Sequence, residues 1–307
     1  MKNEFYKTTV VIFAYNRLEN LRSLWDSLLN CEGIGNRSIV IFHDGLKDNA
    51  SDEDRKKWEN VKDWLTNLSG NVSIEVRFSV TNQGLAKSVH NGVSQILKTE
   101  EQVIVLEDDL LLANGFLNFM DEALQVYKDS ENIFSISGYS RLNKTDSYQG
   151  KDVFLFPRPS SWGWGTWSNR WEPFELNKFD RSELANYQRL KLFQKGGVDL
   201  TWMLRNQVLG KIDSWAIQWS WYQFINDAYS IYPICSKVQN IGSGPDATHT
   251  AKLHGLEGEI CEDKLYLPAD LVVDQKMISD YGKLYRIGYF SWFKNLLFLT
   301  RLRFGIG

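Results

Sequence analysis

The chain has 307 residues, a formal net charge of -3, and 43% apolar and 24% charged residues. Its length allows one large α/β domain or two small ones with a substantial core, and its ordinary composition argues against extended disorder. The slightly negative charge provides no general attraction to nucleic acid.

The cysteines and the N-terminus bear on the compartment. The segment MKNEFYKTTVV contains no apolar stretch before the first expected strand, so we expect no secretory signal. Cys31, Cys235 and Cys261 form no CxxC pair, and reduced thiols are the simplest expectation. Both features favour a cytoplasmic protein.

Apolar patterning predicts alternating strands and helices in the first half of the chain. Four short, apolar, β-branched segments are predicted strands: 8–14, 38–42, 72–80 and 102–106. Predicted helices occupy 18–29, 51–68 and a segment that ends at residue 97. This alternation indicates a mostly parallel sheet flanked by helices, with right-handed crossovers.

The second half is less regular. The pattern predicts a helix over 116–127, strands over 133–139 and 153–156, a tryptophan- and glycine-rich loop over 157–171, and helical structure over 182–209. Residues 281–307 carry basic but no acidic side chains, with apolar residues at helical spacing. This tail fits a basic amphipathic helix on an anionic membrane surface, and equally a helix docked on the protein.

Polar clusters follow each of the four predicted strands. They are Tyr15-Asn16-Arg17, Asp44, Asn82-Gln83-Gly84 and Glu107-Asp108-Asp109. Each cluster alone is typical of a turn. Ligands of parallel sheets bind at the carboxyl ends of the strands, so four clusters at this edge favour a nucleotide site.

The three consecutive carboxylates have apolar residues on both sides, in VLEDDLLL. Hard oxygen ligands suit Mg²⁺ or Mn²⁺ beside a diphosphate. Side chains alternate along an extended segment, so we expect Glu107 and Asp109 to point one way and Asp108 the other. The alternative is a loop whose acids are simply solvated.

The segments TVVIFAYNR, SIVIFHDG, VTNQGLAKSVHNGV and VIVLEDDLLLANGFLNFM occur in this order. Together they resemble nucleotide-sugar glycosyltransferases of the Rossmann-like GT-A fold, specifically bacterial family-2-like enzymes. VIVLEDDLLLANGFLNFMDEAL is also similar to the metal-site region of the first N-acetylglucosaminyltransferase of animal N-glycan maturation. There Glu-Asp-Asp serves as the equivalent of the Asp-x-Asp motif.

The resemblance implies roles for individual residues. Asp44 would accept the uracil imide proton, Glu107 and Asp108 would contact sugar and ribose, and Asp109 would hold the metal. The other implied nucleotide-sugar-binding residues are Ala14, Tyr15, Asn16, Arg17, Asn82, Gly84, Lys87 and Asn91. His90-Asn91 replaces the family's Arg-Asn, so a basic contact there would have to come from Lys87.

Further residues follow from the resemblance downstream. Asp213 in KIDSWAIQW corresponds to the general base of inverting members, although Asp is also a favoured helix cap. His249 in NIGSGPDATHT would bind the metal or diphosphate; a lone loop histidine is otherwise a surface residue. Trp162, Trp164 and Trp167 could form an acceptor platform, because indole faces stack on sugar rings. For Trp202, Trp215, Trp219 and Trp221 we expect core positions.

These inferences lead to one principal hypothesis. Residues 1–255 would form a GT-A domain, with a nucleotide-sugar half (1–128) and an acceptor half (129–255), followed by an extension over 256–307. The enzyme would use Mn²⁺ or Mg²⁺, a nucleotide-sugar donor and a glycan or lipid-linked glycan acceptor at the inner face of the bacterial membrane.

Two other classes of protein would show different sequence features. A nucleotidyltransferase predicts a glycine-rich basic loop after the first strand, and TVVIFAYNRLENL lacks one. A non-catalytic carbohydrate-binding protein predicts loss of the acids or of Asp213, and all are present.

Overall fold

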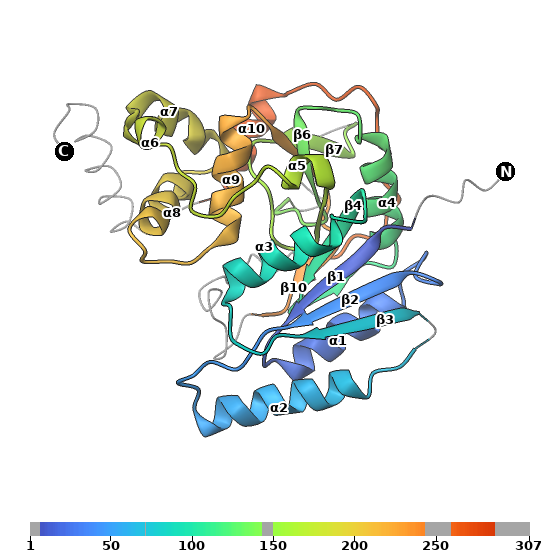
Figure 1. The fold of residues 1–307 in the computed structure, drawn as a ribbon. Coiled ribbons are helices and arrows are strands. Elements are labelled where there is room, and N and C mark those ends of the chain that lie inside the picture. Colours follow the sequence, from blue (N-terminus) through green and yellow to red (C-terminus); the bar gives the residue numbers. More distant parts are fainter. Residues whose placement is uncertain (1–6, 71, 143–149, 243–258, 286–307) are drawn as a thin grey trace.

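A mixed eight-stranded sheet forms the centre of the protein (Figure 1). The computed structural model describes residues 7–70, 72–142, 150–242 and 259–285. The strand order is β3-β2-β1-β4-β8-β6-β9-β7, and β10 pairs separately with β5. The strands are β1 (Thr9–Ala14), β2 (Ser38–His43), β3 (Ser73–Phe78), β4 (Gln102–Glu107), β5 (Leu110–Leu112), β6 (Ile133–Ser137), β7 (Val153–Phe156), β8 (Trp164–Trp167), β9 (Tyr229–Pro233) and β10 (Val238–Asn240).

Helices connect the parallel strands and cover both faces of the sheet. They are α1 (Leu18–Leu29), α2 (Asp52–Thr66), α3 (Leu85–Ile96), α4 (Phe116–Val126), α5 (Ser168–Trp171), α6 (Arg181–Ala185), α7 (Tyr187–Phe193), the 3-10 helix η1 (Gln194–Gly196), α8 (Asp199–Val208), α9 (Trp215–Ile225) and α10 (Gln275–Gly282). The predicted α/β class with a mostly parallel sheet flanked by helices is confirmed.

The strands β3, β2, β1 and β4 are parallel neighbours, so their carboxyl ends lie along one edge. Phe13 on β1 is in register with Phe42 on β2 and with Glu107 on β4. This alignment brings the polar residues after each strand to the same edge, as the sequence predicted.

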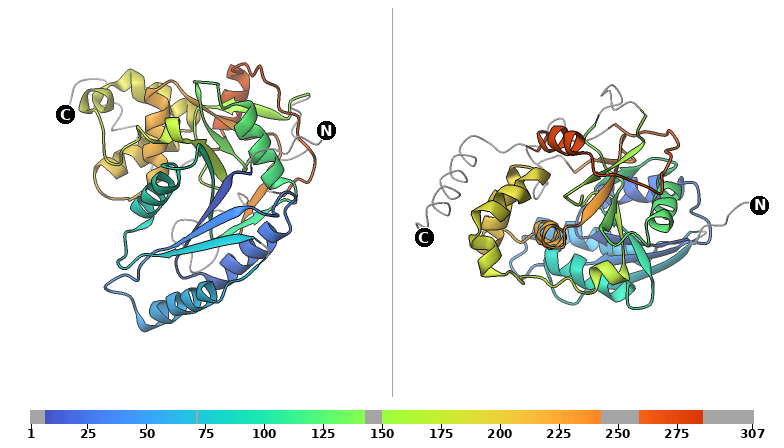
Figure 2. Two further views of the ribbon diagram at one scale, coloured as in Figure 1. Left: turned by 45° about the vertical axis from the view of Figure 1, so that its right-hand side comes forward. Right: turned by 90° about the horizontal axis from the view of Figure 1, so that it is seen from above.

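Alternate residues of β1 point into two separate cores. Val10 and Ile12 belong to a core with α1, α2 and α4, whereas Val11 and Phe13 belong to one with α3 and α9. Figure 2 shows the resulting three layers. The face covered by α3 and α9 is therefore distinct from the face covered by α1.

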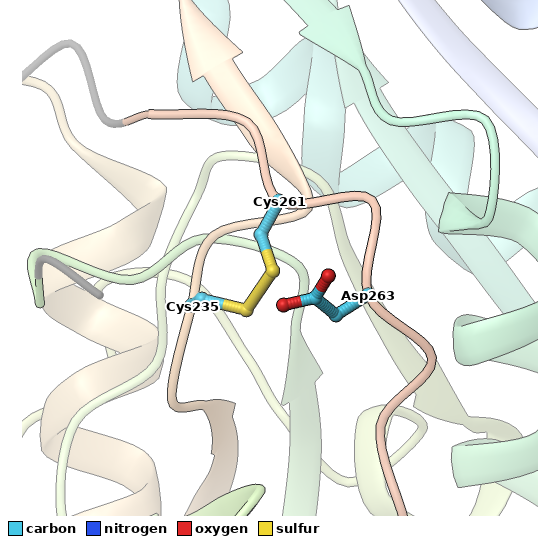
Figure 3. Close-up of side chains that lie close together, drawn as sticks. All are labelled: Cys235, Cys261 and Asp263. Atoms are coloured by element: carbon cyan, nitrogen blue, oxygen red, sulfur yellow. A yellow bond between two sulfur atoms is a disulfide. The ribbon is translucent and has the colours of Figure 1, made fainter.

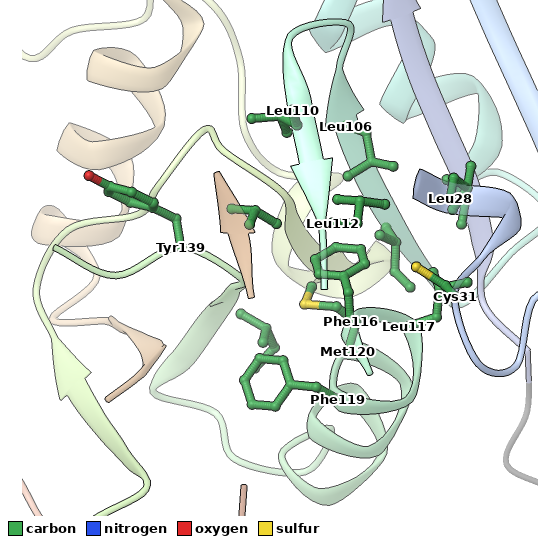
Figure 4. Close-up of a cluster of buried hydrophobic side chains, with 14 of the residues drawn as sticks. Leu28, Cys31, Leu106, Leu110, Leu112, Phe116, Leu117, Phe119, Met120 and Tyr139 are labelled. Atoms are coloured by element: carbon green, nitrogen blue, oxygen red, sulfur yellow. The ribbon is translucent and has the colours of Figure 1, made fainter. Parts of the chain in front are cut away.

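The short strand β5 packs on α4 immediately after the acidic residues. Leu110, Leu112, Phe116 and Met120 are buried in one cluster (Figure 4). β5 also pairs with β10, with Leu110 opposite Asn240. The chain that follows Asp109 is thereby held on two sides.

Two segments of the second half differ from prediction. The expected loop over 157–171 contains β8 and α5, because Trp164 and Trp167 are buried in a strand that pairs with β4 and β6. The helical stretch over 182–209 is divided into α6, α7, η1 and α8. Asn186 is extended and caps α7 through its side chain, and Gly197 has a φ of 132°. Both conformations interrupt a continuous helix.

The C-terminal extension is described over residues 259–285, where α10 packs against β7 and β9. The predicted amphipathic tail lies outside the described residues from 286 onward, and the domain boundaries stay predictions. Within the described parts of the chain, no helix is long and apolar enough to cross a membrane.

Cys235 and Cys261 form a disulfide with a Cα–Cα distance of 5.8 Å (Figure 3). The expectation of reduced thiols is wrong for this pair and holds only for the buried Cys31. The disulfide also removes the argument for a cytoplasmic protein that was based on reduced thiols, since disulfides persist mainly in oxidising compartments. Asp263 lies beside the two sulfurs, but disulfide sulfurs are not thiolates, so this group lacks thiolate metal ligands.

We expect reduction of the disulfide to destabilise the protein. The bond joins residues separated by 26 positions in sequence. Closing a loop of this size is worth about 2–4 kcal/mol through the unfolded chain. Urea unfolding should show a lower midpoint with dithiothreitol than without it, and a Cys235→Ser/Cys261→Ser variant should be insensitive to the reductant. Equal midpoints for the oxidised and reduced wild type would contradict the expectation.

Candidate active site

Three acidic residues occupy the junction of β4 and β5, and we call them the acidic turn (Glu107-Asp108-Asp109). Glu107 ends β4, and Asp108 and Asp109 form the turn before β5. One Arg17 nitrogen bonds Asp108, and the other donates to Asp109 Oδ2 at 2.8 Å. The prediction that Asp109 points the same way as Glu107 and opposite to Asp108 is therefore wrong, because the turn directs both aspartates toward Arg17.

Arg17 and the two aspartates form a nearly enclosed ion cluster. The side chains of Asp108 and Asp109 are 4% and 6% exposed, and that of Arg17 is 22% exposed. Burial acts to lower the pKa of Arg17, but the two carboxylates outweigh it and raise this pKa above its ordinary value. Burial also raises the pKa of Asp108, whereas Arg17 and the Tyr15 N–H oppose that rise.

Asp109 retains an unused ligand position. Its Oδ1 is buried and has no hydrogen-bond partner among the residues that the structure describes. Its backbone carbonyl accepts from Ile241 N at 2.8 Å, and a Cβ at Gly242 would lie 2.2 Å from its Oδ2. An unpartnered buried carboxylate oxygen is costly unless a cation or donor satisfies it. The oxygen-rich acidic turn therefore fits Mg²⁺ or Mn²⁺.

Glu107 faces the other side of the sheet, toward α9. The Trp215 indole N–H donates to its carboxylate. Burial and then the charge of Asp109 raise the pKa of Glu107, while Arg17 opposes this rise. Trp215 stacks on Trp164 at 4.8 Å between ring centroids, which fixes the indole.

The Asp44 carboxylate binds the loop before α3. Its Oδ1 accepts from the backbone N–H groups of Gly45 and Gln83, both at 2.9 Å. Its Oδ2 accepts from Asn82 Nδ2 and Gly84 N, both at 3.1 Å. Four donors use the lone pairs of a carboxylate. Accepting a uracil imide proton would displace one of them, so in this structure Asp44 holds the loop.

The ends of β1 and β2 are joined by further hydrogen bonds. Asp44 N donates to the Ala14 carbonyl at 3.2 Å, and His43 Nε2 lies 2.8 Å from the Tyr15 carbonyl. Trp58 on α2 donates to the Asp44 carbonyl at 2.8 Å. Asn16 Nδ2 lies 3.5 Å from Asp54, a weaker contact. These contacts fix the backbone at the carboxyl ends of β1 and β2.

Asp213 is exposed and lies two residues before the start of α9. Its Oδ2 would lie 3.5 Å from a Cβ at Gly84, which places it beside the loop that Asp44 holds. The helix cap is Ser214, whose side chain accepts from Ile217 N. The capping alternative for Asp213 is therefore wrong, and its carboxylate lies at the same edge of the sheet.

The remaining predicted site residues are two polar residues of α3 and the three tryptophans expected to bind the acceptor. Asn91 donates to Gln83 at 2.9 Å, and Lys87 is exposed on α3. Among the tryptophans, Trp162 is partly buried against Tyr139. Trp164 and Trp167 are 0% and 4% exposed within β8, so the acceptor platform expected of them is wrong.

The expected core positions of Trp215, Trp219 and Trp221 are confirmed, while Trp202 is only partly buried. His249 lies outside the described residues. The contacts that Trp215 and Gly242 make with the acidic turn were not predicted from sequence. The residues that flank Trp215 and Gly242 in sequence do not indicate these contacts, because the contacts join segments that are far apart in the chain.

Acids, an arginine and a glycine-containing loop at the carboxyl edge of parallel strands are the arrangement expected of a GT-A-like glycosyltransferase. A model of the family "Glycosyl transferase family 2" matches residues 9–199. The chain belongs to this family, whose members transfer a sugar from a nucleotide-sugar donor. No curated protein matches the chain.

Solved structures with similar folds include two glycosyltransferases. The mannosyltransferase PcManGT from Pyrobaculum calidifontis, in complex with GDP-Man and Mn²⁺, is 14% identical over 62% of this chain and 52% of its own, with a TM-score of 0.39. GlyE from Streptococcus pneumoniae TIGR4 is 12% identical over 73% and 45%, with a TM-score of 0.38. This chain thus spans about half the length of the structures it matches. The comparisons do not show the narrower resemblance to the animal N-acetylglucosaminyltransferase.

We expect Gly242→Ala to impair the acidic turn selectively. The added methyl group would lie 2.2 Å from Asp109 Oδ2, so either the carboxylate or the loop must move. Manganese affinity, measured by calorimetry, should fall about ten-fold or more, since a displaced ligand costs over about 1.4 kcal/mol.

Gly35→Ala is the matched control, because no atom lies within 4 Å of its added Cβ. Its manganese affinity should equal that of the wild type. Unchanged affinity in Gly242→Ala would show that Asp109 is not constrained by this loop.

Proposed function

We propose that this protein transfers a sugar from a UDP-sugar to a hydroxyl of a glycan or lipid-linked glycan, with inversion, in bacterial surface polysaccharide synthesis. The observation that carries the proposal is the buried Asp108-Asp109 pair, with an unpartnered Asp109 oxygen, at the carboxyl edge of the sheet. Such an arrangement suits a diphosphate and a divalent cation better than a neutral ligand.

On the donor side, Asp109 would hold Mn²⁺ or Mg²⁺ through its free oxygen. The bound cation would neutralise the charge that develops on the departing diphosphate. Asp108 and Glu107 would contact ribose and sugar. Tyr15 and Asn16 would line the nucleotide pocket beside the loop that Asp44 fixes, and Lys87 would provide a further positive charge from α3.

On the acceptor side, Asp213 would act as general base. It would take the proton of the acceptor hydroxyl while that oxygen forms a bond to the anomeric carbon. The bond from the anomeric carbon to the diphosphate oxygen breaks in the same displacement, and its electron pair leaves with the nucleotide. The exposure of Asp213 at the start of α9 supports this role, because an acceptor can reach it.

The acceptor and the cellular location stay predictions. Trp162, partly exposed beside Tyr139, is the remaining candidate for stacking on an acceptor sugar. His249 would add a ligand for the metal or diphosphate. The basic residues after 281 would hold the enzyme near a lipid-linked acceptor at the inner face of the membrane.

We expect Asp109→Asn to abolish metal-dependent donor binding. UDP, GDP and dTDP would each be titrated calorimetrically into the wild type with and without Mn²⁺. One nucleotide should bind in a Mn²⁺-dependent manner, which identifies the base. The variant should lose this dependence, because an amide oxygen carries no charge and is a weaker ligand for a hard cation.

Asp63→Asn, on the exposed face of α2, is the control and should bind as the wild type does. If a folded wild-type sample bound none of the three nucleotides, the proposed donor site would be wrong.

A second expectation concerns Asp213. Replacement by Asn should reduce kcat by about 10²–10⁴-fold, the usual contribution of a general base. The affinity for UDP with Mn²⁺ should stay unchanged, because Asp213 is assigned to the acceptor. Steady-state turnover with the donor sugar found in a screen, together with calorimetry, separates the two effects.

Asp270→Asn, an exposed substitution in the C-terminal extension, serves as the control for altered surface charge. Full turnover by Asp213→Asn would remove this residue from the mechanism. Loss of UDP affinity without loss of kcat would instead assign it to the donor.

A further inference from the structure

We propose that Arg17 is an exchangeable counter-ion. In the donor-free protein it neutralises Asp108 and Asp109, and when donor and divalent cation bind, its guanidinium leaves Asp109 and pairs with the diphosphate. The inference rests on the proposed function, because it assumes that a nucleotide diphosphate and a metal occupy this site.

The first support is how the guanidinium is shared. Its two terminal nitrogens bond two different carboxylates, Asp108 and Asp109 Oδ2. Arg17 is the residue before α1 and makes no side-chain cap there, so its guanidinium is not needed by the helix. Its side chain is five times more exposed than that of Asp108, at 22% against 4%, so a ligand can approach it.

The second support is that the backbone of Arg17 is fixed while its side chain is long. The Arg17 carbonyl accepts from Leu21 N at 3.0 Å in the first turn of α1. The preceding strand end is held by the contact of His43 with the Tyr15 carbonyl. An exchange of partners therefore needs only side-chain rotation.

The third support is the balance of charge. Two buried carboxylates bring two negative charges against the single positive charge of Arg17, and Asp109 Oδ1 has no partner. A permanent replacement of the metal by Arg17 would leave this oxygen unsatisfied. A divalent cation would satisfy this oxygen. It would also weaken the ion pair between Arg17 and Asp109, since two cations would then compete for one carboxylate.

The diphosphate provides the new partner. Guanidinium groups bind phosphate oxygens through paired hydrogen bonds and retain their charge when partly buried. Because the metal binds Asp109 as Arg17 leaves it, neither aspartate is left without a cation during the exchange, which is the condition that buried ions must meet. It also couples the two ligands, because metal binding releases the arginine that the diphosphate needs.

The test uses the full chain and compares Arg17→Gln with Arg22→Gln, an exposed arginine of α1 paired with Glu19. Binding of Mn²⁺ alone is followed by the loss of its free-ion electron paramagnetic resonance signal. We expect Arg17→Gln to bind Mn²⁺ at least about ten-fold more tightly than the wild type, because a competing charge is removed. Arg22→Gln should match the wild type, and Arg17→Gln/Asp109→Asn should lose the gain.

Calorimetry with UDP at saturating Mn²⁺, and GDP as a second probe, completes the test. Arg17→Gln should bind the nucleotide at least about ten-fold more weakly, since one charged phosphate contact is lost. The two affinities thus move in opposite directions, whereas general damage to the site would lower both.

Weaker or unchanged Mn²⁺ binding by Arg17→Gln would overturn the inference, and so would unchanged nucleotide affinity. In either case Mn²⁺-dependent nucleotide binding by the wild type would leave the proposed function standing. A wild type that binds neither nucleotide would overturn the proposed function and, with it, the transfer of Arg17 to a diphosphate.

Discussion

Two carboxylates buried at the end of β4 must be balanced by positive charge, and the rest of the site is organised around that requirement. An unpaired buried carboxylate is costly, and two neighbouring carboxylates repel each other, so a nearby cation offsets both charges. Arg17 meets the need from the start of α1 and joins the ends of β1 and β4. The parallel register of these strands makes that contact possible. The free oxygen of Asp109 then marks where neutralisation is incomplete.

A third carboxylate, Asp44, fixes the neighbouring part of the edge in a different way. It is bound mainly by backbone N–H groups of the loop before α3, not by a cation. Gly45 permits this because its Cα lies against the backbone of Thr81, where a Cβ would lie 2.3 Å from the carbonyl carbon. Gly84 adopts a φ of 76°, which an L side chain rarely accepts. One acid therefore orders a loop, while the other two are available to a ligand.

Local sequence pattern was sufficient for the strands and helices of about the first hundred residues and insufficient for contacts between distant segments. The strands around Val10 and Ile39 and the helix after Leu18 follow from apolar periodicity, and the switch-point rule located their polar ends. The alternation rule failed at Asp109 because it assumes an extended chain, whereas Asp108 and Asp109 form a turn. The disulfide and the contact of Gly242 with Asp109 arise from pairing between residues far apart in sequence, which periodicity does not encode.

The abundance of tryptophan has a structural explanation that bears on catalysis. Trp164, Trp171, Trp215 and Trp219 pack together on the face covered by α3 and α9. Large rigid rings fix the helices that they join, because few rotamers fit a close-packed core. Trp215 is the first residue of α9, and it also binds Glu107. Because Asp213 lies two positions earlier, the same aromatic packing that restrains Glu107 also restrains the candidate base. The buried tryptophans therefore affect the candidate active site by fixing the positions of Glu107 and Asp213, without contacting a sugar.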